Sequence, residues 1–269
     1  MRDCLHMAIA GAFALSAFHS FAEAGEYPAS HGSLTWSAGG FIAVGPKYEG
    51  SDSYELVGAP YVFPSFGDAA NMIAIRGADD VRFRVFETNG FVAGPLAGYK
   101  FDRDEDDGDK LIGLGDVDGG IVIGGFVGYQ VLPWLTFDVS YHRTVTGDAD
   151  GGQLRFGVEY EAPVSRTVTL LGRIGTTYAD DDYMAAYFGV SAAQEKTSAA
   201  KLPIYDADAG FKDVHFDLGA RVQFDDRWTL KFGGRYGRLI GDAADSPVIE
   251  TEDQFSGFAN VTYKFGTLY

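Results

Sequence analysis

Cysteine is almost absent from the sequence. The one cysteine among 269 residues is Cys4. It lies in residues 1–24, which have the features of a secretory signal: an apolar segment at 7–18 precedes a small-x-small site that ends in Ala24. We therefore predict a signal peptide cleaved after Ala24 and a single domain over 25–269. That domain would contain neither a disulfide bond nor a thiol nucleophile.

Long apolar runs and an excess of basic residues are also missing. No stretch approaches the roughly 18 consecutive apolar residues of a membrane-spanning helix, and no segment shows a convincing helical period. The chain has 21 Lys and Arg against 38 Asp and Glu, a formal net charge of −17. Because nucleic-acid phosphates are met by Lys and Arg, this balance argues against a nucleic-acid partner.

Alternation of apolar and polar residues is the strongest pattern that is present. It runs through 214–224, 228–236 and 255–265, where residues such as Phe216 point one way and Asp217 the other. A side-chain period of two predicts β-strands. Long strands with aromatic residues at both ends, joined by short turns and long loops, are typical of a transmembrane antiparallel β-barrel of the outer-membrane type.

The whole chain gives about twelve strands. The hairpin at 71–87 is the least regular, and omitting it leaves ten strands as the alternative. Short turns are expected at one, periplasmic, end: 67–70, 87–90, 132–134, 163–166 and 225–227. Long loops are expected mostly at the other end: 45–53, 103–119, 179–213 and 241–254. A soluble β-sandwich is the competing architecture, but Tyr and Phe at strand ends disfavour it, since water-facing strands carry Lys and Glu there.

The alternation places charged side chains on the inward faces of the predicted strands. These lumen-facing candidates are Arg82, Arg84, Lys100, Asp138, Arg155, Glu159, Arg173, Asp217, Arg221, Lys231, Arg235 and Lys264. Two roles remain open for them. A basic lining would attract anionic solutes through a pore. Alternatively, the charges pair with one another and fill a narrow barrel, which the cost of burying unpaired charge favours.

The loop at 103–119 is unusually acidic, with seven acidic and two basic residues. Clustered carboxylates can bind divalent cations. The spacing does not fit an EF-hand, because Gly108 comes one position late and Gly113 occupies the twelfth position. A solvated acidic surface loop is therefore favoured, and no metal site or cofactor is predicted.

The sequence gives little support to catalysis. The histidines after the signal peptide are His31, His142 and His215. The pattern places no serine beside His142 or His215, as nucleophilic catalysis would require. We predict that the protein is not an enzyme and has no catalytic residues.

Six segments together resemble the MipA/OmpV family of Gram-negative outer-membrane proteins. They are PKYEGSD at 46–52, RDEDDGDKLIGLGDVDG at 103–119, ADDDYMAAYFGVS at 179–191, AGFKDV at 209–214, GDAADSPV at 241–248 and YKF at 263–265. The tail at 266–269 extends beyond the family's usual terminal Phe. The resemblance implies an outer-membrane barrel surrounded by lipid and lipopolysaccharide, and it brings no shared catalytic motif.

One branch of that family, the MltA-interacting proteins, implies a more specific role. The role is a non-catalytic scaffold that links a murein lytic transglycosylase to a penicillin-binding protein during peptidoglycan synthesis and remodelling. Contact would use the short turns, residues 25–33 and the barrel rim. A small-solute or anion channel and a surface adhesin remain as alternatives.

Overall fold

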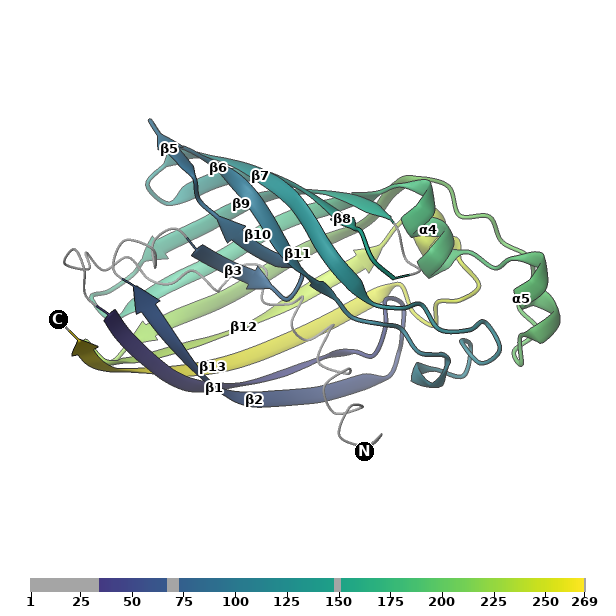
Figure 1. The fold of residues 1–269 in the computed structure, drawn as a ribbon, viewed down its shortest axis with the longest axis horizontal. Coiled ribbons are helices and arrows are strands. Elements are labelled where there is room, and N and C mark those ends of the chain that lie inside the picture. Colours follow the sequence, from purple (N-terminus) through teal and green to yellow (C-terminus); the bar gives the residue numbers. More distant parts are fainter. Residues whose placement is uncertain (1–33, 67–72, 148–150, 269) are drawn as a thin grey trace.

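The computed structural model describes residues 34–66, 73–147 and 151–268. They form one antiparallel sheet of 13 strands that curls into a barrel, with the helices gathered at one end (Figure 1). The strands are β1 (Leu34–Pro46), β2 (Tyr54–Phe66), β3 (Ile73–Gly77), β4 (Asp80–Phe83), β5 (Phe86–Thr88), β6 (Phe91–Lys100), β7 (Gly120–Leu132), β8 (Leu135–Thr144), β9 (Gly152–Pro163), β10 (Val168–Ala179), β11 (Gly210–Gln223), β12 (Trp228–Leu239) and β13 (Asp253–Leu268). The predicted signal peptide, residues 25–33 and the turn at 67–70 lie outside the described residues.

The strand order is β2-β1-β13-β12-β11-β10-β9-β8-β7-β6-β4-β3, and β5 pairs with β6. The predicted antiparallel barrel is thus confirmed. Both β4 and β5 pair with β6, so they act as one strand that is interrupted between Phe83 and Phe86. The count of thirteen instead of about twelve comes from this interruption. Among the described residues no ladder joins β2 to β3, the two ends of the order.

The two faces of the sheet differ as a transmembrane barrel requires. Ile174 and Phe216 are partners in the β10–β11 register, and they are 63% and 48% exposed. Arg173 and Asp217 are partners one position along, and both are buried. The same two strands therefore present apolar groups outward and charged groups inward, because successive side chains of a strand alternate.

Aromatic pairs lie at both ends of the barrel wall. Trp228 and Tyr263 pack at the short-turn end of β12 and β13, with ring centroids 4.7 Å apart. Tyr236 and Phe255 pack at the loop end of the same strands, 5.1 Å apart. Aromatic rings at two levels form the interfacial girdles of outer-membrane barrels, where amphipathic rings meet lipid headgroups.

The expectation that no segment is helical is wrong. The structure contains α4 (Asp181–Phe188), α5 (Ala192–Thr197), α6 (Asp242–Asp245) and the 3-10 helix η2 (Glu105–Asp107). Asp180 caps α4 by accepting a hydrogen bond from the backbone N–H of Tyr183 at 3.0 Å. Helix α4 has only eight residues, too few for a helical period to stand out in the sequence. The buried positions of α4 are Tyr183, Met184, Tyr187 and Phe188. No helix within the described ranges is long and apolar enough to cross a membrane.

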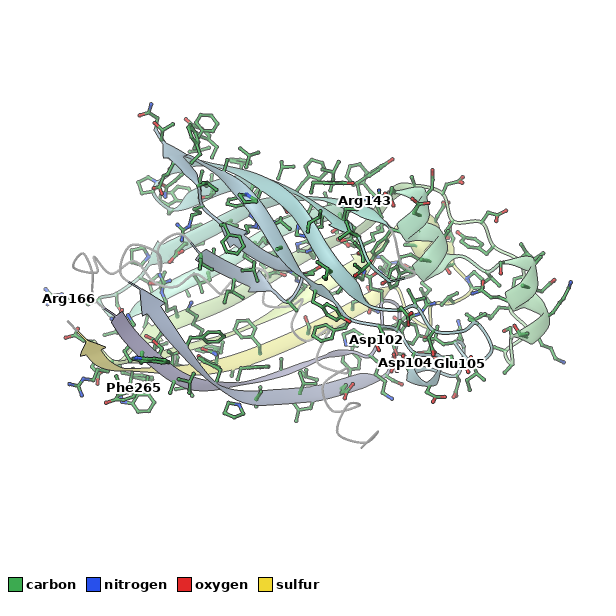
Figure 2. All side chains as sticks on the ribbon, in the orientation of Figure 1. Asp102, Asp104, Glu105, Arg143, Arg166 and Phe265 are labelled. Carbon is green, nitrogen blue, oxygen red and sulfur yellow. The ribbon has the colours of Figure 1, made fainter. Side chains whose placement is uncertain are left out.

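The long loops pack together into a cap over one end of the barrel. Leu111 and Leu114 of the acidic loop are buried in a cluster with Tyr48, Val190 and Val248. The loop at 103–119 is therefore anchored by apolar side chains, which corrects the expectation of a simply solvated loop. Its carboxylates also bond to its own backbone: the Gly113 N–H donates to Glu105 at 2.9 Å. In Figure 2, Asp102, Asp104 and Glu105 lie at the opposite end of the barrel from Arg166 and Phe265.

Replacing one outward isoleucine by arginine tests the lipid-facing surface. We expect Ile174→Arg, near the middle of β10, to destabilise the protein in lipid vesicles. The free energy of unfolding should fall by about 2–4 kcal/mol, because a charge at the bilayer midplane is poorly solvated. Ile204→Arg is the matched control, since Ile204 is 50% exposed in the loop cap, and its cost should stay within about 0.5 kcal/mol. Urea unfolding in vesicles measures both. Equal costs would show that Ile174 does not face lipid.

Candidate functional site in the barrel interior

Three arginines converge on Asp138 inside the barrel. Arg173 binds Asp138 at 2.6 Å, Arg82 at 3.2 Å, and Arg76 lies 3.7 Å away. Arg76 and Arg173 also form ion pairs with Glu159. We call these five residues the Asp138 network. Four of them are buried and Glu159 is nearly so, with a 19% exposed side chain. Each buried guanidinium therefore has a carboxylate partner, as the desolvation of charge demands.

The Asp138 network crosses the lumen. Arg82 lies on β4 and Asp138 on β8, and the sheet order places β6 and β7 between these strands. Arg76 on β3 likewise reaches Glu159 on β9. Neighbouring positions make room for the long side chains: a Cβ at Gly157 would collide with the Arg173 guanidinium. Side chains from both walls thus occupy the interior at this level.

Four of the other eight predicted lumen residues form ion pairs. Arg235 binds Asp217 through two hydrogen bonds of 2.5 and 2.8 Å. Arg155 binds Asp79 at 2.5 Å, and Arg221 binds Glu161. Arg84, Lys231 and Lys264 are half-buried.

Sequence reasoning missed several members of these networks for two reasons. Arg76, Asp79 and Asp80 lie in or beside β3 and β4, the short hairpin whose strands were hard to place, although Ala74 and Arg76 keep the inward alternation. Lys212 was missed because the register slips there: Thr177 pairs with Asp213 but Tyr178 pairs with Phe211. Such a bulge breaks the period of two, and both Lys212 and Asp213 turn inward.

The reading that no serine lies beside His142 is wrong. Ser140 Oγ lies 2.9 Å from His142 Nε2, and Arg82 donates to the same hydroxyl at 3.1 Å. However, Ser140 is only 1% exposed. A nucleophile must reach its substrate, whereas this hydroxyl is enclosed by charged neighbours.

A cavity of about 170 Å³ lies between the barrel interior and the loop cap. Helix α4 contributes Tyr183 and Tyr187 to its lining; their rings stack with centroids 4.5 Å apart. The Lys100 ammonium lies over both rings, 3.9 Å from each centroid, and donates to the Tyr183 hydroxyl. Cation–π contact of this kind holds a charged group away from bulk water.

Glu49, from the β1–β2 loop, joins this cavity to the wall. Its Oε1 binds Lys212 Nζ at 2.5 Å, and its Oε2 accepts from the Tyr183 hydroxyl at 3.0 Å. Burial alone would raise the pKa of Glu49, but Lys212 and Lys100 outweigh burial and hold this pKa below its ordinary value. Glu49 is therefore ionised. Across the part of the chain that the structure describes, no group of three or more His, Cys, Asp or Glu side chains could hold a metal ion.

Comparison with known proteins decides the family. The family model for MltA-interacting protein MipA matches residues 38–265. The chain belongs to this family.

Outer membrane protein OmpV of Vibrio cholerae is 32% identical over 93 residues, which cover 34% of each protein. Omp26La of Vibrio anguillarum is 32% identical over 100 residues, covering 36% of this chain and 37% of that protein. The putative outer membrane protein YiaT of Escherichia coli is 23% identical over 141 residues, 52% of this chain and 56% of YiaT. The chain thus spans a third to just over half the length of these relatives.

The solved structures that the chain matches include an outer-membrane channel and a porin. The COG4313 outer membrane channel from Pseudomonas putida F1 has a TM-score of 0.42 and 13% identity, with 90% of this chain and 98% of that one covered. The KdgM porin has a TM-score of 0.35 and 8% identity, with 87% and 99% covered. This MipA-family protein is an outer-membrane protein, as its named relatives are, and they are described as membrane proteins, not as enzymes.

Removing the central carboxylate tests the Asp138 network. We expect Asp138→Asn to lower the free energy of unfolding by about 3–5 kcal/mol, because buried arginines lose their shared counter-charge. Glu252→Gln is the control: it also breaks an ion pair, with Arg238, but those side chains are 43% and 47% exposed, so its cost should be about 0–1 kcal/mol. Urea titration of both variants in vesicles measures the difference. A similar small cost for both would contradict the network's structural role.

Proposed function

We propose that this protein is a non-catalytic scaffold of the outer membrane that binds a murein lytic transglycosylase at the short-turn end of its barrel. Through that contact it would link the transglycosylase to a penicillin-binding protein in peptidoglycan remodelling. The family description, MltA-interacting protein, names the first partner. The proposal that the protein is not a channel rests on the Asp138 network, which places paired charges in the lumen.

The short-turn end offers the surface that a periplasmic partner would meet. Val164 and Phe224 are 57% and 62% exposed there, and Arg166 and Arg227 are exposed in the same turns. Exposed apolar residues beside arginines are typical of protein-binding surfaces, where both residue classes are enriched. Residues 25–33, the other predicted contact, lie outside the described ranges.

The loop end of the barrel carries exposed acidic residues, unlike the short-turn end. Four acidic residues of the 103–119 loop are exposed: Asp106, Asp109, Asp116 and Asp118. In the proposed orientation they face the lipopolysaccharide, whose phosphates they could approach through shared divalent cations. Contact with lipid and lipopolysaccharide therefore belongs to the proposal, and an adhesin role would use this same cap.

A small-anion channel is the second candidate. The cavity under α4 favours it, because Lys100, Arg103 and Lys212 line that cavity. The Asp138 network opposes it, since paired arginines cross the lumen. The enclosure of Ser140 supports the non-catalytic part of the proposal, because the hydroxyl beside His142 is buried.

Charge reversal at the two ends of the barrel tests the scaffold. We expect purified protein in detergent to bind a purified murein lytic transglycosylase, and the double variant Arg166→Glu with Arg227→Glu to bind at least about tenfold more weakly, equivalent to roughly 1.4 kcal/mol. Lys196→Glu with Lys201→Glu is the control, since it reverses two exposed charges in the loop cap. Biolayer interferometry gives the affinities. Absence of binding by the unchanged protein would overturn the proposal, as would equal losses in both variants.

Conductance separates the scaffold from the channel. We expect no unitary current steps when the protein is inserted into a planar bilayer, because the Asp138 network places paired charges across the lumen between β3–β4 and β8–β10. Folded insertion is checked by its resistance to unfolding by SDS before heating. Reproducible steps that the Asp138→Asn variant enlarges would show that the lumen conducts, and the second candidate would replace the first.

A further inference from the structure

Two cationic side chains lie against one ring of the cavity, and neither forms an ion pair with a described residue. Lys100 Nζ lies 3.9 Å from the centroid of Tyr187, and Arg103 Cζ lies 5.7 Å from it. Their hydrogen bonds go to neutral groups: Lys100 donates to the Tyr183 hydroxyl, and Arg103 Nη1 donates to the Tyr187 carbonyl at 2.8 Å. The neighbouring acid, Glu49, already binds Lys212 and Tyr183.

This charge imbalance is unusual within the barrel. The Asp138 network, the Arg235–Asp217 pair and the Arg155–Asp79 pair each match guanidinium groups with carboxylates. Lys100 and Arg103 form no ion pair with any described residue. Two cations in a poorly hydrated site repel each other, so the arrangement favours an anion that is not part of the chain.

Unsatisfied polar atoms point to the same place. Arg103 Nε, the Tyr187 hydroxyl and His215 Nε2 are buried and have no hydrogen-bond partner among the described residues. All three residues line the cavity of about 170 Å³. Buried polar atoms are rarely left without a partner, because each one costs desolvation free energy. Three such atoms on residues that line one cavity indicate that the cavity holds a polar ligand.

We infer that the cavity beneath α4 binds a small oxyanion, a carboxylate or a phosphate. Lys100 and Arg103 supply the charge, and Arg103 Nε–H and the Tyr187 hydroxyl supply hydrogen bonds. Charge-assisted hydrogen bonds of this kind are stronger than neutral ones. The volume suits such a guest, since about 10–15 Å³ of cavity volume is enough to hold one water molecule. This site is additional to the scaffold surface, which lies at the other end of the barrel.

The ionisation of the site fits this role. Burial raises the pKa of Tyr187 above its ordinary value, and the negative charge of Glu49 raises it further. The phenol therefore keeps its proton and can donate it. Burial lowers the pKa of Arg103, but a guanidinium remains protonated in proteins. Both groups are donors at neutral pH.

Isothermal titration calorimetry of the full chain in detergent tests the inference. The probes are sodium phosphate and sodium acetate, each compared with sodium chloride at the same ionic strength. We expect saturable binding of at least one probe and none of chloride at the same concentration. Binding of phosphate alone or of acetate alone would assign the class of oxyanion, and both results support the site.

Three variants locate the binding. Tyr187→Phe keeps the ring and removes only a hydroxyl that has no hydrogen-bond partner among the described residues, so folding should be retained while the probe binds at least about threefold more weakly. Lys100→Met should weaken binding at least about tenfold. Lys196→Met, at an exposed position on α5, is the control and should bind like the unchanged protein. The inference is overturned if no probe binds, which would leave water as the guest, or if all three variants bind alike.

Discussion

Arg76, Arg82 and Arg173 can remain charged inside this barrel because Asp138, Glu159 and Asp80 lie among them. Removing a guanidinium from water costs several kcal/mol, and only a close carboxylate offsets that cost. The Asp138 network therefore ties the short β3–β4 hairpin to β8, β9 and β10 on the far side of the lumen. This attachment fixes one end of the sheet order.

The exterior of the barrel requires apolar side chains and the interior holds paired charges, and the alternation of side chains along each strand provides both. Ile174 and Phe216 need an apolar surrounding. Arg173 and Asp217, one position away, need partners of opposite charge inside the barrel, which are Asp138 and Arg235. The loop cap differs from both, because its outer side faces water and its inner side lines the cavity. Its apolar cluster around Tyr48 and Leu111 holds the loops together while α4 turns two tyrosines toward the lumen.

Sequence alone predicted the parts of this fold that depend on a regular period. The strands at 214–224 and 228–236 could be assigned because each residue faces either lipid or the lumen, and the charged lumen candidates followed from the same alternation. Lys212 could not be assigned, since a bulge shifts the inward face by one residue. Helix α4 was missed because two turns give too short a pattern, although Asp180 is a good N-cap. The pairing of Arg82 with Asp138 joins strands that are not neighbours, and no local pattern carries that information.

The closure of the sheet has a consequence for how the protein is made. β1 pairs with β13, in a register that sets residue Leu34 opposite Leu268, and the Glu250 N–H donates to the Gly50 carbonyl at 2.7 Å in the cap. These contacts join parts of the chain about 200 residues apart or more, and such distant pairings are slow to form because a long loop must close first. The first strand must therefore wait, with its edge unpaired, until the last strand has left the ribosome and crossed the inner membrane. An open strand edge can pair with another chain, so this strand order exposes the chain to aggregation before the barrel closes.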